Sequence, residues 1–140
     1  MDAKAIDQLL ESQRQYFLSG ATLPVEFRIA MLQRLRETVR RREPDISKAL
    51  TADLGKSGYE GYMCEIGLVL SELGYLIRHT RRFAKRRHVP TPLAQFAASS
   101  YLSPSPYGNV LIMSPWNYPL LLTLDPLADA IAAGNTAIVK

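Results

Sequence analysis

The C-terminal residues, 106–140, carry the pattern that most constrains the fold. Residues 110–113 are apolar and bulky, as in strands buried on both faces, and 136–139 form a second such run. Residues 120–133 between them are long enough for a helix, which Gly134-Asn135 should end. A strand–helix–strand unit almost always closes as a right-handed crossover with parallel strands. The sequence therefore predicts the start of an α/β sheet.

This topology should bring two distant segments together. The carboxyl ends of parallel strands share one edge of a sheet, and ligands of open α/β sheets bind at that edge. We therefore expect residues 114–117, Ser-Pro-Trp-Asn, to lie beside Lys140. Pro126 falls inside the expected helix, so either the helix kinks or Asp125 caps a new helix that begins there.

Upstream, apolar residues at helical spacing predict amphipathic helices, each with one buried face. The third helix should end before Pro90-Thr-Pro92, and 97–106 should form an exposed strand. The three series at this spacing, apolar except for Gln13, are Ile6, Leu9, Leu10, Gln13 and Phe17; Val25, Ile29, Leu32 and Val39; and Tyr59, Tyr62, Met63, Ile66, Val69, Leu70, Leu73, Leu76 and Ile77.

Two long matches carry a family resemblance. The run P-Y-G-N-V-L-I-M-S-P-W-N-Y-P at 106–119, followed by D-A-I-A-A-G-N-T-A-I-V-K at 129–140, resembles the NAD(P)-dependent aldehyde dehydrogenases. Upstream, D-L-G-K-S at 53–57 and Y-M-C-E-I at 62–66 are most similar to the class 3 group. Family members are several times longer, so we expect an N-terminal fragment that lacks the family's nucleophilic cysteine, general-base glutamate and pyrophosphate-contacting glycine turn.

The resemblance implies a catalytic role for Asn117. In the family a cysteine thiolate adds to an aldehyde, and a fixed side-chain amide stabilises the oxyanion that develops. Hydride then passes to the nicotinamide, and water hydrolyses the remaining thioester. From the residue type alone, a second interpretation is that Asn117 caps a helix starting at Tyr118 or Pro119.

The resemblance also implies a site for NAD or NADP. Trp116 and the backbone of Met113, Ser114 and Pro115 would line its nicotinamide-ribose part, and Lys140 would reach the adenosine ribose hydroxyls. The sequence does not choose between the two cofactors. Taken without the resemblance, Trp116 is a candidate core aromatic and Lys140 an ordinary solvated lysine.

Tyr118 and Leu122 match positions that line the family's aldehyde tunnel, which would favour hydrophobic aldehydes of medium or long chain. Core packing is an equal alternative for Leu122. The expected domain organisation is a helical part of the cofactor-binding domain at 1–92, an extended segment of the oligomerisation arm at 93–106 and the start of a Rossmann-like sheet at 107–140. By resemblance, the arm would pair with a second subunit, giving a homodimer.

Composition narrows the remaining possibilities. With 47% hydrophobic and 21% charged residues, 140 residues make one globular unit. The N-terminus lacks a signal or transit pattern, and no apolar run approaches the roughly twenty residues of a membrane span, so a cytoplasmic enzyme is expected. Cys64 is the only cysteine, which predicts no disulfide and no metal site, and its place in a helical series favours a structural thiol.

The basic residues support a rival hypothesis. The net charge of +4 is concentrated in 34–42 and 78–87, and clustered cations on helices can bind nucleic acid. No helix-turn-helix, zinc-finger or aromatic RNA-binding signature accompanies these clusters, so we expect no nucleic-acid partner. A third hypothesis is an inactive structural or interaction fragment. The favoured prediction is oxidation of an aldehyde to a carboxylic acid with NAD(P) by the complete protein, and inactivity of this chain alone.

Overall fold

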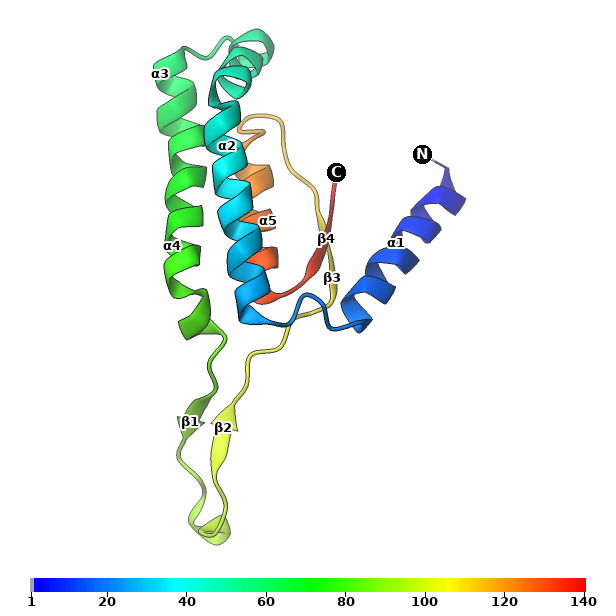
Figure 1. Cartoon of the computed structure of the whole chain (residues 1–140), viewed down its shortest axis with the longest axis vertical. Helices are drawn as coiled ribbons and strands as arrows, with labels where there is room; N and C mark the ends of the chain where they lie inside the picture. Colours follow the sequence, from blue (N-terminus) through cyan, green and yellow to red (C-terminus); the bar gives the residue numbers. More distant parts are fainter. Residues whose placement is uncertain (1) are drawn as a thin grey trace.

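The structure is a computed structural model that describes residues 2–140. A bundle of helices packs beside a small parallel sheet, and a hairpin extends from one end of the bundle (Figure 1). In chain order the elements are α1 (Ala3–Leu18), α2 (Val25–Leu54), α3 (Gly58–Gly61), the π-helix η1 (Tyr62–Ile66), α4 (Gly67–Phe83), β1 (Arg87–Val89), the 3-10 helix η2 (Leu93–Gln95), β2 (Ser100–Leu102), β3 (Asn109–Ile112), α5 (Leu121–Ala133) and β4 (Thr136–Val139).

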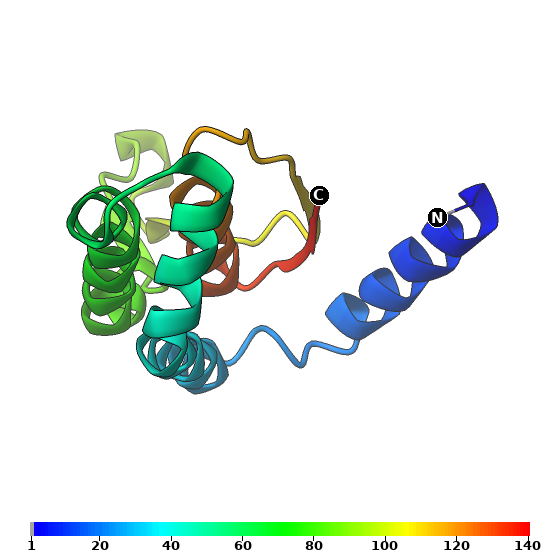
Figure 2. The ribbon, with the colours of Figure 1, turned by 90° about the horizontal axis from the view of Figure 1, so that it is seen from above.

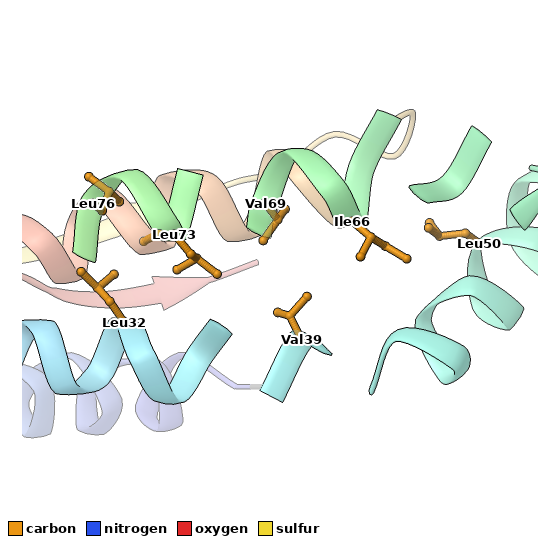
Figure 3. Packing of buried hydrophobic residues seen from close by; sticks show 8 residues of the cluster. Leu32, Val39, Leu50, Ile66, Val69, Leu73 and Leu76 are labelled. Atoms are coloured by element: carbon orange, nitrogen blue, oxygen red, sulfur yellow. The ribbon is translucent and has the colours of Figure 1, made fainter. Parts of the chain in front are cut away.

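The hydrophobic core lies between α2, α4 and α5. Its buried residues are contributed at helical spacing by α2 and by the continuous run from η1 into α4, so the second apolar series and the third from Ile66 onward do face inward (Figure 3). The cluster comprises Leu32, Val39, Leu50, Ile66, Val69, Leu73, Leu76 and Ala128. This packing fixes α5 against the bundle and thereby places the loop that precedes α5.

The third predicted helix is interrupted at its start. Residues 62–66 form the π-helix η1 between α3 and α4. A Cβ on Gly67 would lie 2.9 Å from the carbonyl oxygen of Tyr62, so glycine is needed where the π turn closes. An inserted π turn rotates the side chains around it, and here Glu65 is completely buried, whereas Tyr59 and Met63 of the expected apolar face are exposed.

The strand–helix–strand prediction is confirmed. β3 and β4 pair in parallel, with Asn109 opposite Thr136 and Ile112 opposite Val139. Gly134 ends α5 with a φ of 92°, and the next amide, that of Asn135, donates to the carbonyl of Ala130 over 2.9 Å. The buried side chain of Asn135 then accepts a 2.9 Å hydrogen bond from the amide of Gly108 and ties the two strands together.

Pro126 does not start a new helix. α5 runs without interruption through Asp125 and Pro126, so the expectation that Asp125 caps a second helix is wrong. The first-turn amides of α5 are bonded by a distant side chain, that of Glu65, as described below. The helix therefore needs no cap within its own sequence.

The projecting hairpin corrects one boundary. α4 ends at Phe83, before Pro90 as predicted, whereas the strand expected over 97–106 is reduced to the three residues of β2, which pairs antiparallel with β1. The Thr91 hydroxyl accepts a 3.0 Å hydrogen bond from the amide of Ser100 beside this pair. Prolines limit the ladder because they lack a donor. The predicted arm segment 93–106 holds only one of the two strands.

α1 lies apart from the helical bundle and approaches the sheet instead (Figure 2). The Asn109 side chain donates to the carbonyl of Leu10 over 3.2 Å, and Phe17 lies close to Gly108. Ile6 and Leu10 of the predicted apolar face are nevertheless 46% and 43% exposed. The first apolar series therefore forms a helix, as predicted, without a fully buried face.

Candidate cofactor and oxyanion site

The sheet brings the two predicted halves of the site together. Residues 113–119 leave the carboxyl end of β3, and Lys140 directly follows β4. The amide of Lys140 donates to the carbonyl of Ile112 over 2.9 Å, and the amide of Ser114 donates to the carbonyl of Lys140 over 3.3 Å. The expectation that 114–117 and Lys140 lie side by side is confirmed.

The side chains at this edge face outward. Trp116 is 89% exposed and Met113 is 70% exposed, while Pro115 and Lys140 are also exposed. The alternative that Trp116 is a core aromatic is wrong for this structure. Exposing large apolar side chains to water is costly, so an exposed apolar surface often marks a binding site. Trp116 and Met113 offer such a surface, on which a flat ring could stack.

Ser114 is linked to the start of the following helix. Its hydroxyl accepts a 2.7 Å hydrogen bond from the hydroxyl of Thr123 in the first turn of α5. Both side chains are half-buried. The loop from β3 to α5 is therefore fastened to the helix that it leads into.

Asn117 is exposed and does not cap α5. The helix begins at Leu121, and its N-cap position, Leu120, makes no side-chain capping bond. The interpretation of Asn117 as a cap of a helix at 118 or 119 is thus wrong. The backbone carbonyl of Asn117 instead accepts a 3.2 Å hydrogen bond from Nζ of Lys56, which comes from the end of α2.

Lys56 and Glu65 form a buried ion pair behind this loop. Lys56 is 7% exposed and Glu65 is completely buried. Glu65 Oε1 accepts from Lys56 Nζ, whereas Oε2 accepts from the amides of Leu120 and Leu121 over 2.8 and 3.3 Å. The Lys56 ammonium also lies 4.2 Å from the centre of the Tyr118 ring. The pair is satisfied by backbone groups and a ring, as buried charges require.

The sequence analysis missed the roles of Lys56 and Glu65, although both lie in motifs that carry the family resemblance. The available signal was a glutamate inside an apolar helical series, which is rare unless the carboxylate is paired. Its neighbour Cys64 is half-buried in η1. The prediction that Cys64 is a structural thiol remains a prediction.

The two residues expected to line a substrate tunnel are also uncovered. Tyr118, in the loop before α5, is 38% exposed, and Leu122, in the first turn of α5, is 36% exposed. Leu122 is not part of the buried core cluster, so the core-packing alternative is not supported.

Further along α5, two carboxyl groups have raised pKa values. Burial, with smaller contributions from Glu72 and Asp129, raises the pKa of Asp125 to about 6, and burial raises the pKa of Asp129. Oδ1 of Asp125 is buried without a hydrogen-bond partner among the described residues. Both carboxyl groups lie on the helix after the loop, whereas the exposed residues 113–117 precede it.

Among residues 2–140, no helix combines the length and the apolar character that a membrane crossing requires. The second basic cluster, 78–87, is divided between the last turns of α4 and strand β1, so it is not one helix face. Within it, Arg81 is paired with Glu26 of α2.

The sequence matches the family model described as "Aldehyde dehydrogenase family" over residues 1–140. The chain belongs to the aldehyde dehydrogenase family, and the alignments show the predicted likeness to its class 3 members. It is 41% identical to aldehyde dehydrogenase family 3 member A2 of Rattus norvegicus, with 96% of this chain and 28% of that protein covered. It is 39% identical to the "aldehyde dehydrogenase, dimeric NADP-preferring" of Canis lupus familiaris, covering 96% and 30%.

The chain is also similar to a bacterial aldehyde dehydrogenase in sequence, and to a solved bacterial structure in fold. The chain is 40% identical to the 4,4'-diaponeurosporen-aldehyde dehydrogenase of Staphylococcus aureus over 96% of this chain and 29% of that protein. The substrate-bound structure of Staphylococcus aureus AldH superposes with a TM-score of 0.94 at 39% identity, covering 99% of this chain and 30% of that one. The predicted α/β fold, that of part of an aldehyde dehydrogenase, is confirmed. The chain spans about 30% of the length of these relatives.

Proposed function

We propose that this chain is the N-terminal part of an NAD(P)-dependent aldehyde dehydrogenase. In that enzyme it would supply one wall of the cofactor site and the amide that stabilises the oxyanion. The observation that carries the proposal is the loop 113–117, exposed except for the half-buried Ser114 and held beside Lys140 at the carboxyl edge of the parallel strands. This is the edge at which open α/β sheets bind their ligands.

The residues present fit a nicotinamide dinucleotide. Met113 and Trp116 offer exposed apolar surface for a ring and ribose, the backbone of Ser114 and Pro115 lies beside them, and the Lys140 ammonium offers donors to ribose hydroxyls. When bound, NAD or NADP would accept the hydride that leaves the aldehyde carbon. The dog relative's printed name, NADP-preferring, supports this cofactor class.

Asn117 is proposed to act on the carbonyl oxygen of the aldehyde. A cysteine thiolate from outside these 140 residues would attack the carbonyl carbon, and the electron pair of the C=O bond would move to oxygen. The Asn117 side-chain N–H groups would donate to this oxyanion, which forms only as the C–S bond forms. The C=O bond re-forms as hydride leaves the same carbon for NAD(P)+, which gives a thioester, and water then replaces the cysteine sulfur. Aldehyde, NAD(P)+ and water thus give carboxylic acid, NAD(P)H and a proton.

Substrate and partner follow from the same surfaces. Tyr118 and Leu122 are proposed to line the approach of a hydrophobic aldehyde. The β1–β2 hairpin is proposed to act as an arm that pairs with a second subunit, in keeping with the printed name of the dimeric dog relative. The isolated 140-residue chain should be inactive, because its one cysteine, Cys64 in η1, is expected to be structural and the nucleophile is expected from outside these residues. The unpaired outer edges of β3 and β4 should also make the isolated chain prone to aggregation.

The test uses the complete gene product, assayed for NAD(P)H absorbance with medium-chain and aromatic aldehydes. Asn117→Ala should lower kcat by about 10²–10³-fold, the typical effect of removing one oxyanion donor. Asn109→Ala is a matched control at the opposite end of β3, where the side chain bonds Leu10 and Thr136, and it should leave kcat within about twofold. Full activity of Asn117→Ala would contradict the oxyanion role. A wild type without turnover on either cofactor would overturn the enzyme proposal.

A further inference from the structure

A buried ion pair lies behind the loop that carries Asn117. Lys56 follows the end of α2 and Glu65 lies in the π turn η1, yet their side chains meet the backbone of 117–121 between β3 and α5. Figure 1 shows these segments gathered at the same end of the bundle, where α2 ends and α3 begins. Two side chains from neighbouring segments thus converge behind a loop that is remote from them in sequence.

Each charged group divides its contacts between its partner and the loop. Lys56 Nζ donates to Glu65 Oε1 and, over 3.2 Å, to the carbonyl of Asn117. Glu65 uses its other oxygen to accept from the amides of Leu120 and Leu121. The pair therefore holds both ends of the five-residue stretch that begins with Asn117.

Stability alone is a poor reason for this arrangement. Removing two charges from water is costly, and well-packed apolar residues of similar volume often stabilise a protein as well or better. Hydrogen bonds to charged groups are, however, roughly twice as strong as those between neutral groups and need a defined geometry, so they restrict backbone position more than apolar contacts do. The side chain of Asn117 is itself exposed, and its position depends on the backbone that carries it. A catalytic donor needs placement within about 0.5 Å.

We propose that Lys56 and Glu65 are positioning residues that set the backbone of Asn117, so that its amide points at the developing oxyanion. Lys56 acts through the Asn117 carbonyl, and Glu65 acts by orienting Lys56 and by fixing the amides at the start of α5. The π turn is part of this device because it turns Glu65 inward. The inference rests on the proposed oxyanion role of Asn117.

The test is a double-mutant cycle in the complete gene product. Lys56→Met alone leaves the Glu65 carboxylate buried without its partner and is expected to unfold the enzyme or lower its Tm strongly. The informative variant is Lys56→Met combined with Glu65→Gln, which removes both charges while the Gln oxygen can still accept from Leu120. It should retain a Tm near that of the wild type, because no unpaired charge remains.

In this folded variant we expect kcat to fall by about tenfold or more, since misplacement of a catalytic group by about 1 Å can cost 10²-fold. In an Asn117→Ala background the same two substitutions should change kcat by less than about twofold, because the group they position is gone. A purely structural role would give the same loss in both backgrounds. That result, or a double variant with wild-type kcat, would overturn the inference.

A control variant tests whether the effect depends on where the ion pair lies or only on the loss of an ion pair. Glu26→Gln combined with Arg81→Met removes an exposed carboxylate–cation pair that links α2 to α4 at the opposite end of the bundle. It should leave kcat within about twofold. The failures are distinguishable: an Asn117→Ala enzyme with full activity refutes the proposed function, whereas loss in Asn117→Ala without loss in the Lys56/Glu65 variant refutes only this inference.

Discussion

Replacing Gly134 with alanine should destabilise the junction between α5 and β4 by about 3–5 kcal/mol, for two additive reasons. Gly134 has a φ of 92°, in the left-handed region, where an L residue with a Cβ costs about 1–2 kcal/mol. In addition, a Cβ built on Gly134 would lie only 2.7 Å from Cζ of Arg28 and 2.8 Å from Nε and Nη2. Such contacts are too short, so the guanidinium must move.

The displacement is costly because Arg28 is anchored by backbone carbonyls. Its guanidinium donates to Thr22 over 3.0 Å, to Leu23 over 2.7 Å and to Ala132 over 3.3 Å, and burial lowers the pKa of the group. Each bond contributes about 0.5–1.5 kcal/mol net, so loss of most of them adds about 2–3 kcal/mol. These bonds hold the end of α5 against the segment that leads into α2.

Gly55→Ala supplies the matched control. Gly55 ends α2 with a φ of 67°, and no atom lies within 4 Å of a Cβ built there, so only the backbone cost of about 1–2 kcal/mol applies. The assay is native-state hydrogen exchange on the complete gene product, which reports the opening free energy of each segment separately. In an Arg28→Ala background, Gly134→Ala should cost no more than Gly55→Ala does. Equal costs of the two glycine substitutions in the wild-type background would refute the reasoning.

Three further changes test the core, the strand junction and a carboxyl group. Leu73→Ala should cost about 2–5 kcal/mol in thermal unfolding, because Leu73 is fully buried, while Leu68→Ala on the exposed side of α4 should cost under about 1 kcal/mol; similar costs would contradict the core assignment. Asn135→Ala should cost about 1–3 kcal/mol by leaving the Gly108 amide unpaired, and Asn135→Asp, which keeps an acceptor, should cost less. The pKa of Asp125 is raised from 3.8 to about 6, so the folded state binds a proton between these values that the unfolded chain has released, and stability falls as pH rises through that window. Asp125→Asn should therefore be more stable than wild type near pH 7.5, by about 1 kcal/mol after solvent screening, with no advantage below about pH 4; a pH-independent difference in urea unfolding would contradict this.

Local pattern predicted the parallel unit and the helical series because their signals are periodicities and end signals between residues close in sequence. The strand β3, the helix α5 and its glycine end follow from periodicity and from the αL preference of Gly134. β1 was missed because three residues carry too little alternation to be read as a strand. The pairing of such a short strand with β2 is set by tertiary contacts.

In the candidate site, too, some residues could be placed from the sequence and others could not. The exposed residues 113–117 and Lys140 could be placed from topology, since strand direction alone puts them at one edge. The buried contacts of Lys56 and Glu65 could not, because the π turn that turns Glu65 inward depends on packing around Gly67. Sequence pattern therefore located the groups offered to the ligand but not the groups that hold them.

The buried groups that hold the loop between β3 and α5 also explain how its exposed side chains can be kept in place. An exposed loop between a strand and a helix would ordinarily be mobile, because its backbone groups bond mainly to water. Here Thr123 holds Ser114, Lys56 holds Asn117, and Glu65 holds Leu120, so the loop is fixed at its start, middle and end while its side chains remain uncovered. A rigid backbone with free side chains is the state that preorganised transition-state stabilisation requires, since the donor then needs no reorganisation when charge develops. The buried charges are consequently better explained by the geometry of the loop than by the stability of the helices around them.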